Sequence, residues 1–296
     1  MKKTKNNIEK KLTPLTIIML ILLICYTFSL FVLLGWGILS SLKTEFEFVD
    51  FPYQLPKTWK FENYTQVFKY FYVTSKATGE SVYLPQLLFN TLYIAISQAL
   101  AATIVPMVTA YACARFQYKL SNLLCSIVLI TMAVPIVGNQ ASTISMQMAL
   151  GIYDNIWIHW IANAHFLGMY FLVFHGMFKS IPSSYSEAAK IDGASNFRVM
   201  SQVIFPLALT TAGTVFLLNF IGYWNDYQNP LLYLPSYPTI ANAFFTIIKV
   251  TAPDVTIDTF PHKLASTSII LLPILVIFLL FQKKLMGNLT LGGVKG

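Results

Sequence analysis

The chain of 296 residues is 56% hydrophobic and only 11% charged, and its mean hydropathy is +0.61. Ordinary soluble domains are about 45–50% apolar and about 25% charged, so a soluble fold of this size could not cover its surface with so few charges. The composition predicts an integral membrane protein and excludes a disordered chain, a disulfide scaffold and a nucleic-acid-binding module.

Long uncharged stretches predict where helices cross the membrane. A helix needs about 20 apolar residues to span the hydrocarbon core, and six stretches satisfy this. The predicted spans are 16–40, 86–112, 121–141, 156–178, 206–225 and 264–283. The stretch 227–248 is rejected because Pro230, Pro235 and Pro238 interrupt it, and a broken helix cannot face lipid. The predicted fold is an all-α membrane protein with six transmembrane helices.

Charge orients these spans, because cytoplasmic segments carry an excess of Lys and Arg. With a cytoplasmic N-terminus, the inner segments have a net charge of +10 and the outer segments −2, so both termini are expected in the cytoplasm. In chain order, the predicted parts are a cytoplasmic N-terminus 1–15, a first helix 16–42, an outer loop 43–84, a transmembrane core 85–284 and a cytoplasmic tail 285–296. The core includes an inner loop 179–206 and an outer segment 226–263.

The inner loop has the signals of two short helices. Ser184 and Glu187 have the spacing of a capping box, which predicts a helix that starts just after Ser184. Gly193 is expected to end this helix in the left-handed conformation. A second helix is predicted over 195–205, with Pro206 turning the chain into the fifth span. Its apolar face would consist of Phe197, Met200, Val203 and Ile204. Periodicity alone leaves open whether these helices rest on lipid headgroups or contact another protein.

The stretch EAAKIDGA (187–194) resembles the EAA motif of bacterial ATP-binding-cassette (ABC) importer permeases. The residues in register with that pattern are Glu187, Ala188, Ala189, Gly193 and Pro206, while Val203 and Phe205 replace its Ile and Leu. Three further features are similar to the carbohydrate branch: FENYTQVF (61–68) with FNTL (89–92), GYWNDYQNPL (222–231) and LTLGGVKG (289–296). Beyond about residue 50, the chain resembles the second permease subunit of maltose-type sugar importers.

This resemblance implies a type I ABC importer permease architecture in a bacterial cytoplasmic membrane. The implied partners are a second, different permease, two ATPase subunits, an external sugar-binding protein, membrane lipid and the carbohydrate. Residues 179–206, which we call the EAA segment, would fit a cleft on the ATPase and transmit its closure to the spans. The candidate contact residues are Glu187, Ala188, Ala189, Asp192, Gly193 and Pro206.

The C-terminal tail resembles one that reaches between the two ATPases in maltose-type systems. Its candidate contact residues are Gly292, Gly293 and Lys295. A glycine-containing tail is equally compatible with a simple frayed end, so both interpretations stay open.

The chain contains no sequence motif for catalysis. It lacks the G-x-x-x-x-G-K-[ST] phosphate loop, so ATP and Mg²⁺ are expected on the partner ATPase and this chain is not expected to be an enzyme. His159, His165 and His175 do not have the spacing of metal ligands on a helix, so no metal site is expected. Paired carboxylates, typical of proton- or sodium-coupled pumps, are missing from the predicted spans.

Polar and aromatic side chains within the spans are candidates for a sugar path, because sugars need hydrogen bonds and aromatic faces. Asn90, Gln147 and Asn219 could supply the hydrogen bonds, and Tyr223 and Trp224 the aromatic faces. Hydrogen bonding between helices is the alternative role of the polar side chains.

Together these features predict the permease subunit of an ABC importer for a mono- or oligosaccharide, which forms the pathway with a second permease. One alternative is an ATP-independent secondary transporter or channel, although such a protein has no reason to carry an EAA segment. The other is an ABC permease for a solute that is not a sugar.

Overall fold

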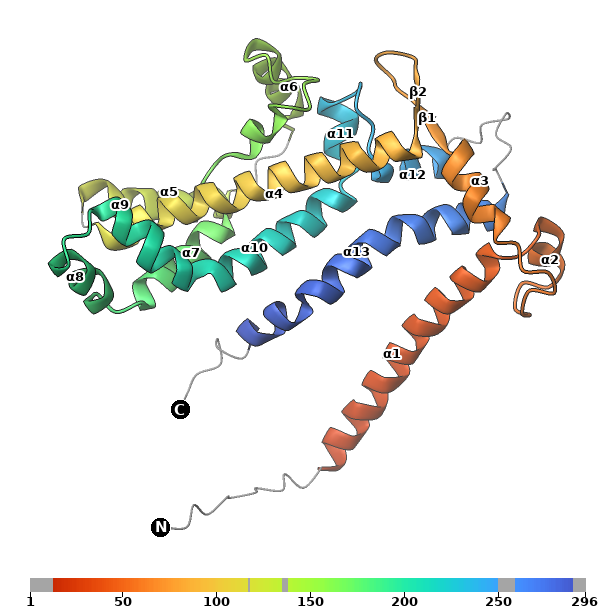
Figure 1. Cartoon of the computed structure of the whole chain (residues 1–296), viewed down its shortest axis with the longest axis horizontal. Coiled ribbons are helices and arrows are strands. Elements are labelled where there is room, and N and C mark those ends of the chain that lie inside the picture. The colour runs from red at the N-terminus through yellow and green to blue at the C-terminus, as the bar shows by residue number, and fades with distance from the viewer. Residues whose placement is uncertain (1–12, 117, 135–137, 250–258, 290–296) are drawn as a thin grey trace. The chain divides into compact units, whose positions relative to one another are not determined.

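A computed structural model of the protein is shown in Figure 1. It describes residues 13–116, 118–134, 138–249 and 259–289. The described residues are mostly helical, with one two-stranded hairpin. They form two compact units, 1–67 with 255–269 and 68–254 with 270–296. The EAA segment lies wholly in the second unit.

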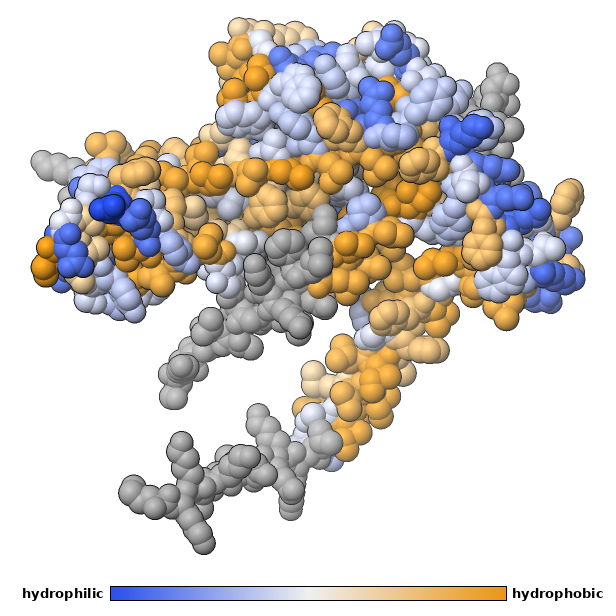
Figure 2. Space-filling view, viewed as in Figure 1, coloured by the Kyte–Doolittle hydropathy of each residue, from blue (hydrophilic) through white to orange (hydrophobic). Residues whose placement is uncertain are grey.

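The first unit begins with α1 (Pro14–Ser41), a helix without a polar face. The hydroxyl of Thr13 caps it by accepting the N–H of Thr16 at 3.3 Å. Large hydrophobic side chains are exposed along most of its length, and Figure 2 shows the resulting hydrophobic surface. Twenty-eight residues make a helix of about 42 Å, which is enough to cross a bilayer.

Beyond α1, a buried lysine organises the chain around α2 (Glu45–Asp50). The Nζ of Lys43 donates hydrogen bonds of 2.9 Å to the carbonyls of Phe51 and Pro52. The indole N–H of Trp36 donates to the same Pro52 carbonyl at 2.8 Å. The segment after α2 is thereby folded back beside the last turns of α1.

Two further helices begin in the first unit, α3 (Glu62–Tyr70) and α13 (Phe260–Leu289). They are joined by His262, whose Nε2 lies 2.7 Å from the Oε1 of Gln66. The first backbone N–H of α13 donates to Glu45 at 3.0 Å. Residues distant in sequence are thus held together by polar contacts.

The core of the second unit is built on α4 (Leu84–Arg115), which packs along α7 (Met169–Ser180) and α10 (Phe205–Asn225). All three helices can be followed in Figure 1. Ala95 and Ala99 are fully buried in α4 and lie against aromatic side chains of α10. Small residues at such contacts allow two helices to approach closely.

Shorter elements surround the N-terminal half of α4. They are β1 (Tyr72–Thr74), β2 (Ser81–Tyr83), the 3₁₀ helix η1 (His159–Asn163), α11 (Gln228–Tyr233) and α12 (Ile240–Lys249). The amide of Asn90 in α4 donates to the Pro238 carbonyl at 3.0 Å. Asp154 accepts the backbone N–H and the hydroxyl of Ser236 at 2.9 and 2.6 Å. These bonds fix the chain between α11 and α12 to the rest of the unit.

Three helices of the described residues are long and apolar enough to cross a membrane: Pro14–Ser41, Leu84–Arg115 and Asn196–Asn225. The first, second and fifth predicted spans lie within them. The sixth, 264–283, lies within α13. Long uncharged stretches of sequence therefore predicted these four helices correctly.

The third and fourth predicted spans, 121–141 and 156–178, are not single helices. The former is divided between α5 (Lys119–Ala133) and α6 (Gln140–Ala149), with Gly138 at φ +83° between them. In the latter, α7 starts only after Gly168, which has φ +129°. Hydropathy does not detect these breaks, because they depend on backbone conformations that glycine adopts readily and other residues rarely do.

Candidate functional site

The EAA segment contains the predicted first helix, α8 (Ser184–Ile191), but the predicted capping box is wrong. The N-cap is Ser183, and no side chain caps the helix. The N–H groups of Ser186 and Glu187 donate to the Ser183 carbonyl at 2.9 and 3.0 Å. Because Ser183 already has helical backbone angles, the Ser184 side chain lies inside the first turn instead of at the capping position.

The C-terminal end of α8 is a Schellman motif, as the sequence predicted at Gly193. This glycine has φ +81°. Its N–H donates to the Lys190 carbonyl at 3.0 Å, and the Ala194 N–H donates to the Ala189 carbonyl at 2.9 Å. This pair of bonds satisfies carbonyls that would otherwise lack partners and reverses the chain sharply.

The second predicted helix is longer than expected and does not end at Pro206. The hydroxyl of Ser195 caps α9 (Asn196–Arg198). The chain then continues through the π-helical turn η2 (Val199–Ile204) directly into α10. The prediction that Pro206 turns the chain is therefore wrong.

The π-helical turn explains how a proline is accommodated in this helix. A proline ring clashes with the carbonyl four residues before it and has no N–H to donate. In η2 the Phe205 N–H instead donates to the Met200 carbonyl, five residues back. This wider turn makes room for the ring of Pro206, and it rigidly joins α9 to α10.

The apolar side chains near this turn differ in how far they are exposed. Val199 and Ile204 are buried, whereas Phe197 is 72% exposed. Ile191, the last residue of α8, is 86% exposed. Neither Phe197 nor Ile191 was among the predicted contact residues; Phe197 was predicted only as part of the apolar face of the second helix.

Most of the predicted coupling residues lie together on α8 and its cap. Glu187, Ala188, Asp192 and Gly193 are exposed, and Ala189 is half-buried against the core. Pro206 is exposed on the first turn of α10, apart from this group. The structure therefore presents one exposed helical surface that a second protein could contact.

Aromatic packing and one arginine attach the EAA segment to the helical core. The Tyr111 ring meets Phe178 and Phe205 edge-on, with ring centroids 5.4 and 5.7 Å apart. At the end of α4, the Nη2 of Arg115 donates to the Ile181 carbonyl at 2.8 Å. A cation at this place also complements the negative ends of α4 and α7.

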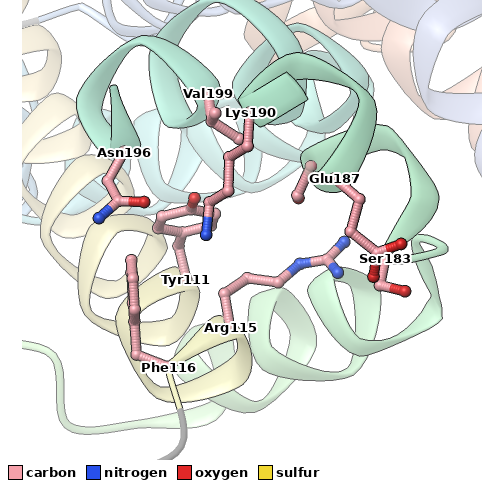
Figure 3. Close-up of a pocket in the computed structure, with 9 residues that line it drawn as sticks. Tyr111, Arg115, Phe116, Ser183, Glu187, Lys190, Asn196 and Val199 are labelled. Atoms are coloured by element: carbon pink, nitrogen blue, oxygen red, sulfur yellow. The ribbon is translucent and has the colours of Figure 1, made fainter. Parts of the chain in front are cut away.

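A pocket of about 200 Å³ lies between the end of α4 and α8. Its walls include Tyr111, Arg115, Phe116, Ser186, Glu187 and Lys190. Figure 3 shows Arg115 and Lys190 reaching into this space from α4 and α8 respectively. Two buried polar atoms, the Nε of Arg115 and the Oγ of Ser186, have no hydrogen-bond partner within the described structure.

A second, more open cavity of about 490 Å³ contains two of the predicted sugar-path residues, Asn219 and Tyr223, together with Asp226. The Asn219 amide donates to the Thr103 hydroxyl at 3.4 Å. The Tyr223 hydroxyl donates to the Asn163 side chain at 3.2 Å. Both side chains lie at the cavity surface, and each can form further hydrogen bonds beyond these.

The remaining predicted path residues lie elsewhere. Trp224 is only 1% exposed and packs between α4 and α10, and Asn90 holds the Pro238 carbonyl. Gln147 is buried in α6, with an unpartnered Oε1. The tail residues Gly292, Gly293 and Lys295 lie outside the described residues. Among the residues described, no group of three or more His, Cys, Asp or Glu side chains could hold a metal ion.

Comparison with known proteins identifies relatives over most of the chain. Residues 102–287 match the family described as "Binding-protein-dependent transport system inner membrane component". The galactooligosaccharides transport system permease protein GanQ of Bacillus subtilis is 27% identical over 82% of each chain. The diacetylchitobiose uptake system permease protein NgcG of Streptomyces coelicolor is 24% identical over 92% of this chain and 86% of its own.

The fold is similar to that of a solved structure. The match is to a chain in the crystal structure of a bacterial ABC transporter involved in the import of the acidic polysaccharide alginate. It covers 90% of this chain and 95% of that chain, with a TM-score of 0.70 and 22% sequence identity. At this identity the likeness shows a common fold.

Proposed function

Because this chain belongs to the family of binding-protein-dependent transport system inner membrane components, we propose that it is the multi-pass permease subunit of an ABC importer for a carbohydrate. The relatives GanQ and NgcG are named for galactooligosaccharides and diacetylchitobiose, which supports a small sugar polymer as substrate. The EAA segment carries the proposal: it contains the exposed helix α8, which Gly193 closes, and the turn α9, which continues through η2 into α10.

The proposed mechanism follows from that continuity. An ATPase that binds α8 and closes on ATP would displace α8. The hydrogen bonds of the Schellman motif and of the η2 turn would transmit this displacement to α10. Arg115 and the Tyr111 ring would pass the same displacement to α4. Moving α4 and α10 together changes the pathway between two arrangements, as alternating access requires.

We further propose six spans, with both termini in the cytoplasm of a bacterium and the chain in its cytoplasmic membrane. Positive charge on the inner segments supports this orientation. In the third and fourth spans, the shorter helices α5 and α7 would cross part of the membrane. Less regular chain joined to them would cross the rest. Irregular backbone at membrane depth is tolerated where protein covers it or where it lines a cavity.

The proposed partners are a second permease, two ATPase subunits that bind ATP and Mg²⁺, and an external sugar-binding protein. Glu187, Ala188, Ala189, Asp192 and Gly193 would form the ATPase contact, and Pro206 would maintain its link to α10. Exposed Ile191 and Phe197 add apolar area to that contact. The tail residues Gly292, Gly293 and Lys295 are proposed to reach the ATPases as well.

The sugar path is proposed to run past Asn219 and Tyr223, which lie on the open cavity. Gln147 is retained as a path candidate, because its buried Oε1 has no partner among the described residues. Asn90 and Trp224 would support the path indirectly, by holding the helices and the adjoining segment in place.

Co-purification tests the proposal directly. The tagged chain is extracted from its native membrane in a mild detergent, and the proteins that accompany it are identified by mass spectrometry. We expect an ATPase and a different permease, and we expect ATP hydrolysis by the complex to rise with its sugar and binding protein. Recovery of the chain alone, as a homo-oligomer without ATPase in several detergents, would favour a channel or secondary transporter.

A further inference from the structure

The pocket beneath α8 gathers hydrogen-bond donors from three elements. Arg115 comes from the last turn of α4, Ser186 and Lys190 from α8, and Asn196 from the start of α9. Figure 3 shows the Lys190 side chain extending towards Tyr111, and the Arg115 guanidinium lying beside Glu187 and Ser183. Glu187 also lines the pocket, so its ionised walls carry two positive charges and one negative charge.

Two of these donors have no hydrogen-bond acceptor among the described residues. The Nε of Arg115 and the Oγ of Ser186 are buried without a partner in the described part of the chain. A buried donor left unpaired is unfavourable, and more so when it belongs to a charged group. The Nη2 of Arg115 is already engaged by Ile181, so the guanidinium is held in place with its Nε free to donate.

In the proposed orientation, the pocket would lie at the depth of lipid headgroups. The 32 residues of α4 span about 48 Å, whereas the hydrocarbon core is about 30 Å thick. If α4 is centred in the hydrocarbon core, its last turn, with Arg115, extends beyond the core. Tyr111 and Phe116 line the pocket, so its wall beside α4 is aromatic.

We propose that this pocket binds the phosphoryl headgroup of an anionic membrane lipid, such as phosphatidylglycerol. Basic pockets between helices on the cytoplasmic side of membrane proteins are suited to such headgroups. The lipid phosphate would accept from the Nε of Arg115, the Oγ of Ser186 and the ammonium of Lys190. It would thereby bridge the end of α4 to the EAA helix. This last consequence rests on the proposed function, whereas the binding itself requires only the cytoplasmic orientation.

Lipid retention and ATP hydrolysis test the proposal together. The chain, with the subunits that accompany it, is placed in nanodiscs of phosphatidylcholine alone or with added phosphatidylglycerol. Retained lipids are counted by native mass spectrometry. The variants are Arg115→Gln and Lys190→Gln, and the control is Lys179→Gln, which removes an exposed cation near the pocket that does not line it. Lys190 is exposed, so its replacement should not impair folding.

We expect each pocket variant to bind phosphatidylglycerol about fivefold more weakly and to lose the rise in ATP hydrolysis that this lipid produces. Lys179→Gln should keep both properties. If inorganic phosphate added to phosphatidylcholine nanodiscs produces the same rise in ATP hydrolysis, the ligand is phosphate from solution and the lipid proposal is overturned. Equal lipid retention by wild type and both pocket variants would overturn the proposal.

A loss of the ATPase subunit with unchanged lipid retention would also overturn it, because the pocket would then be a protein contact. Failure of the proposed function looks different: lipid retention depends on Lys190 while no sugar stimulates ATP hydrolysis in wild type. The two hypotheses can therefore fail separately.

Discussion

Gly193 determines the direction in which the chain leaves α8. Its backbone has φ +81°, a conformation that costs residues with a Cβ roughly 1–2 kcal/mol. A Cβ built at this position would meet no atom within 4 Å. The requirement for glycine is therefore conformational and does not arise from crowding.

Gly193→Ala should weaken coupling for this reason. A cost of about 1–2 kcal/mol lowers the equilibrium constant for the native bend about five- to thirtyfold, and sugar-stimulated ATP hydrolysis by the reconstituted importer should fall as the bend is lost. Gly193→Asn should be milder, because Asn tolerates the left-handed conformation. Gly176→Ala, in the middle of α7, is the matched control and should behave as wild type. Normal hydrolysis by Gly193→Ala would show that the bend is dispensable.

His262 makes the first unit sensitive to pH. Burial lowers the pKa of its imidazole below the ordinary value of 6.5, and nearby Glu45 opposes this effect. The unfolded chain therefore takes up a proton at a higher pH than the folded chain. The stabilisation is fully present above about pH 6.5 and is lost as pH falls through the lowered pKa.

Limited proteolysis on either side of about pH 6.5 measures this effect. Cleavage between residues 43 and 67 should accelerate at the lower pH, because a charged imidazole is unfavourable at the half-buried place where His262 contacts Thr259 and Gln66. His262→Gln should remove the acceleration while the rest of the chain is cut as before. The same acceleration in His262→Gln would assign the effect to another group.

At the scale of elements, η2 connects α9 to α10, the helix that contains the fifth predicted span. In a regular α-helix the ring of Pro206 would clash with the carbonyl four residues before it, and the wider turn of η2 avoids this clash. Pro206→Ala would remove that constraint and allow regular helical hydrogen bonds through 199–206. The change would rotate α8 and α9 about the axis of α10.

We expect Pro206→Ala to retain the ATPase on purification, because the surface of α8 is unchanged. Transport should be several-fold slower, because α8 is rotated relative to α10. Uptake of labelled sugar into proteoliposomes, set against ATP hydrolysis in the same vesicles, separates the two effects. A control is Gly213→Ala, one helical position in α10 with open space around it. Unchanged transport by Pro206→Ala would mean that the π-helical turn has no part in coupling.

The elements differ in how far sequence could predict them. The helices α4 and α10 follow from uninterrupted apolar sequence, and the end of α8 follows from Gly193, since each depends on local residue type. The break after Ala133, the late start of α7 and the exposure of Phe197 depend on backbone conformation or on packing between distant segments. At the candidate site, the motif identified α8, but the pocket required Arg115 from α4, which lies about 70 residues earlier.

At the scale of the whole molecule, the orientation in the membrane can be tested by labelling. In a background without the three native cysteines, a cysteine at exposed Ser195 should react with a membrane-impermeant maleimide only after the membrane is opened. A cysteine at Ser81, exposed in β2, should react in intact spheroplasts. Both residues lie in the second unit, so the pair compares its two ends. Reaction of both cysteines from the same side would exclude the six-span arrangement.

The exposed Ile191 and Phe197 side chains have a consequence for how the cell handles this protein before it is assembled. If an ATPase covers these side chains, as proposed above, a copy made without it would leave two large apolar groups exposed to water, and such patches favour aggregation and recognition by chaperones and proteases. Once a partner covers them, that signal disappears. The residues proposed to favour docking would then also mark surplus subunits for removal, so that degradation as well as synthesis would balance the stoichiometry.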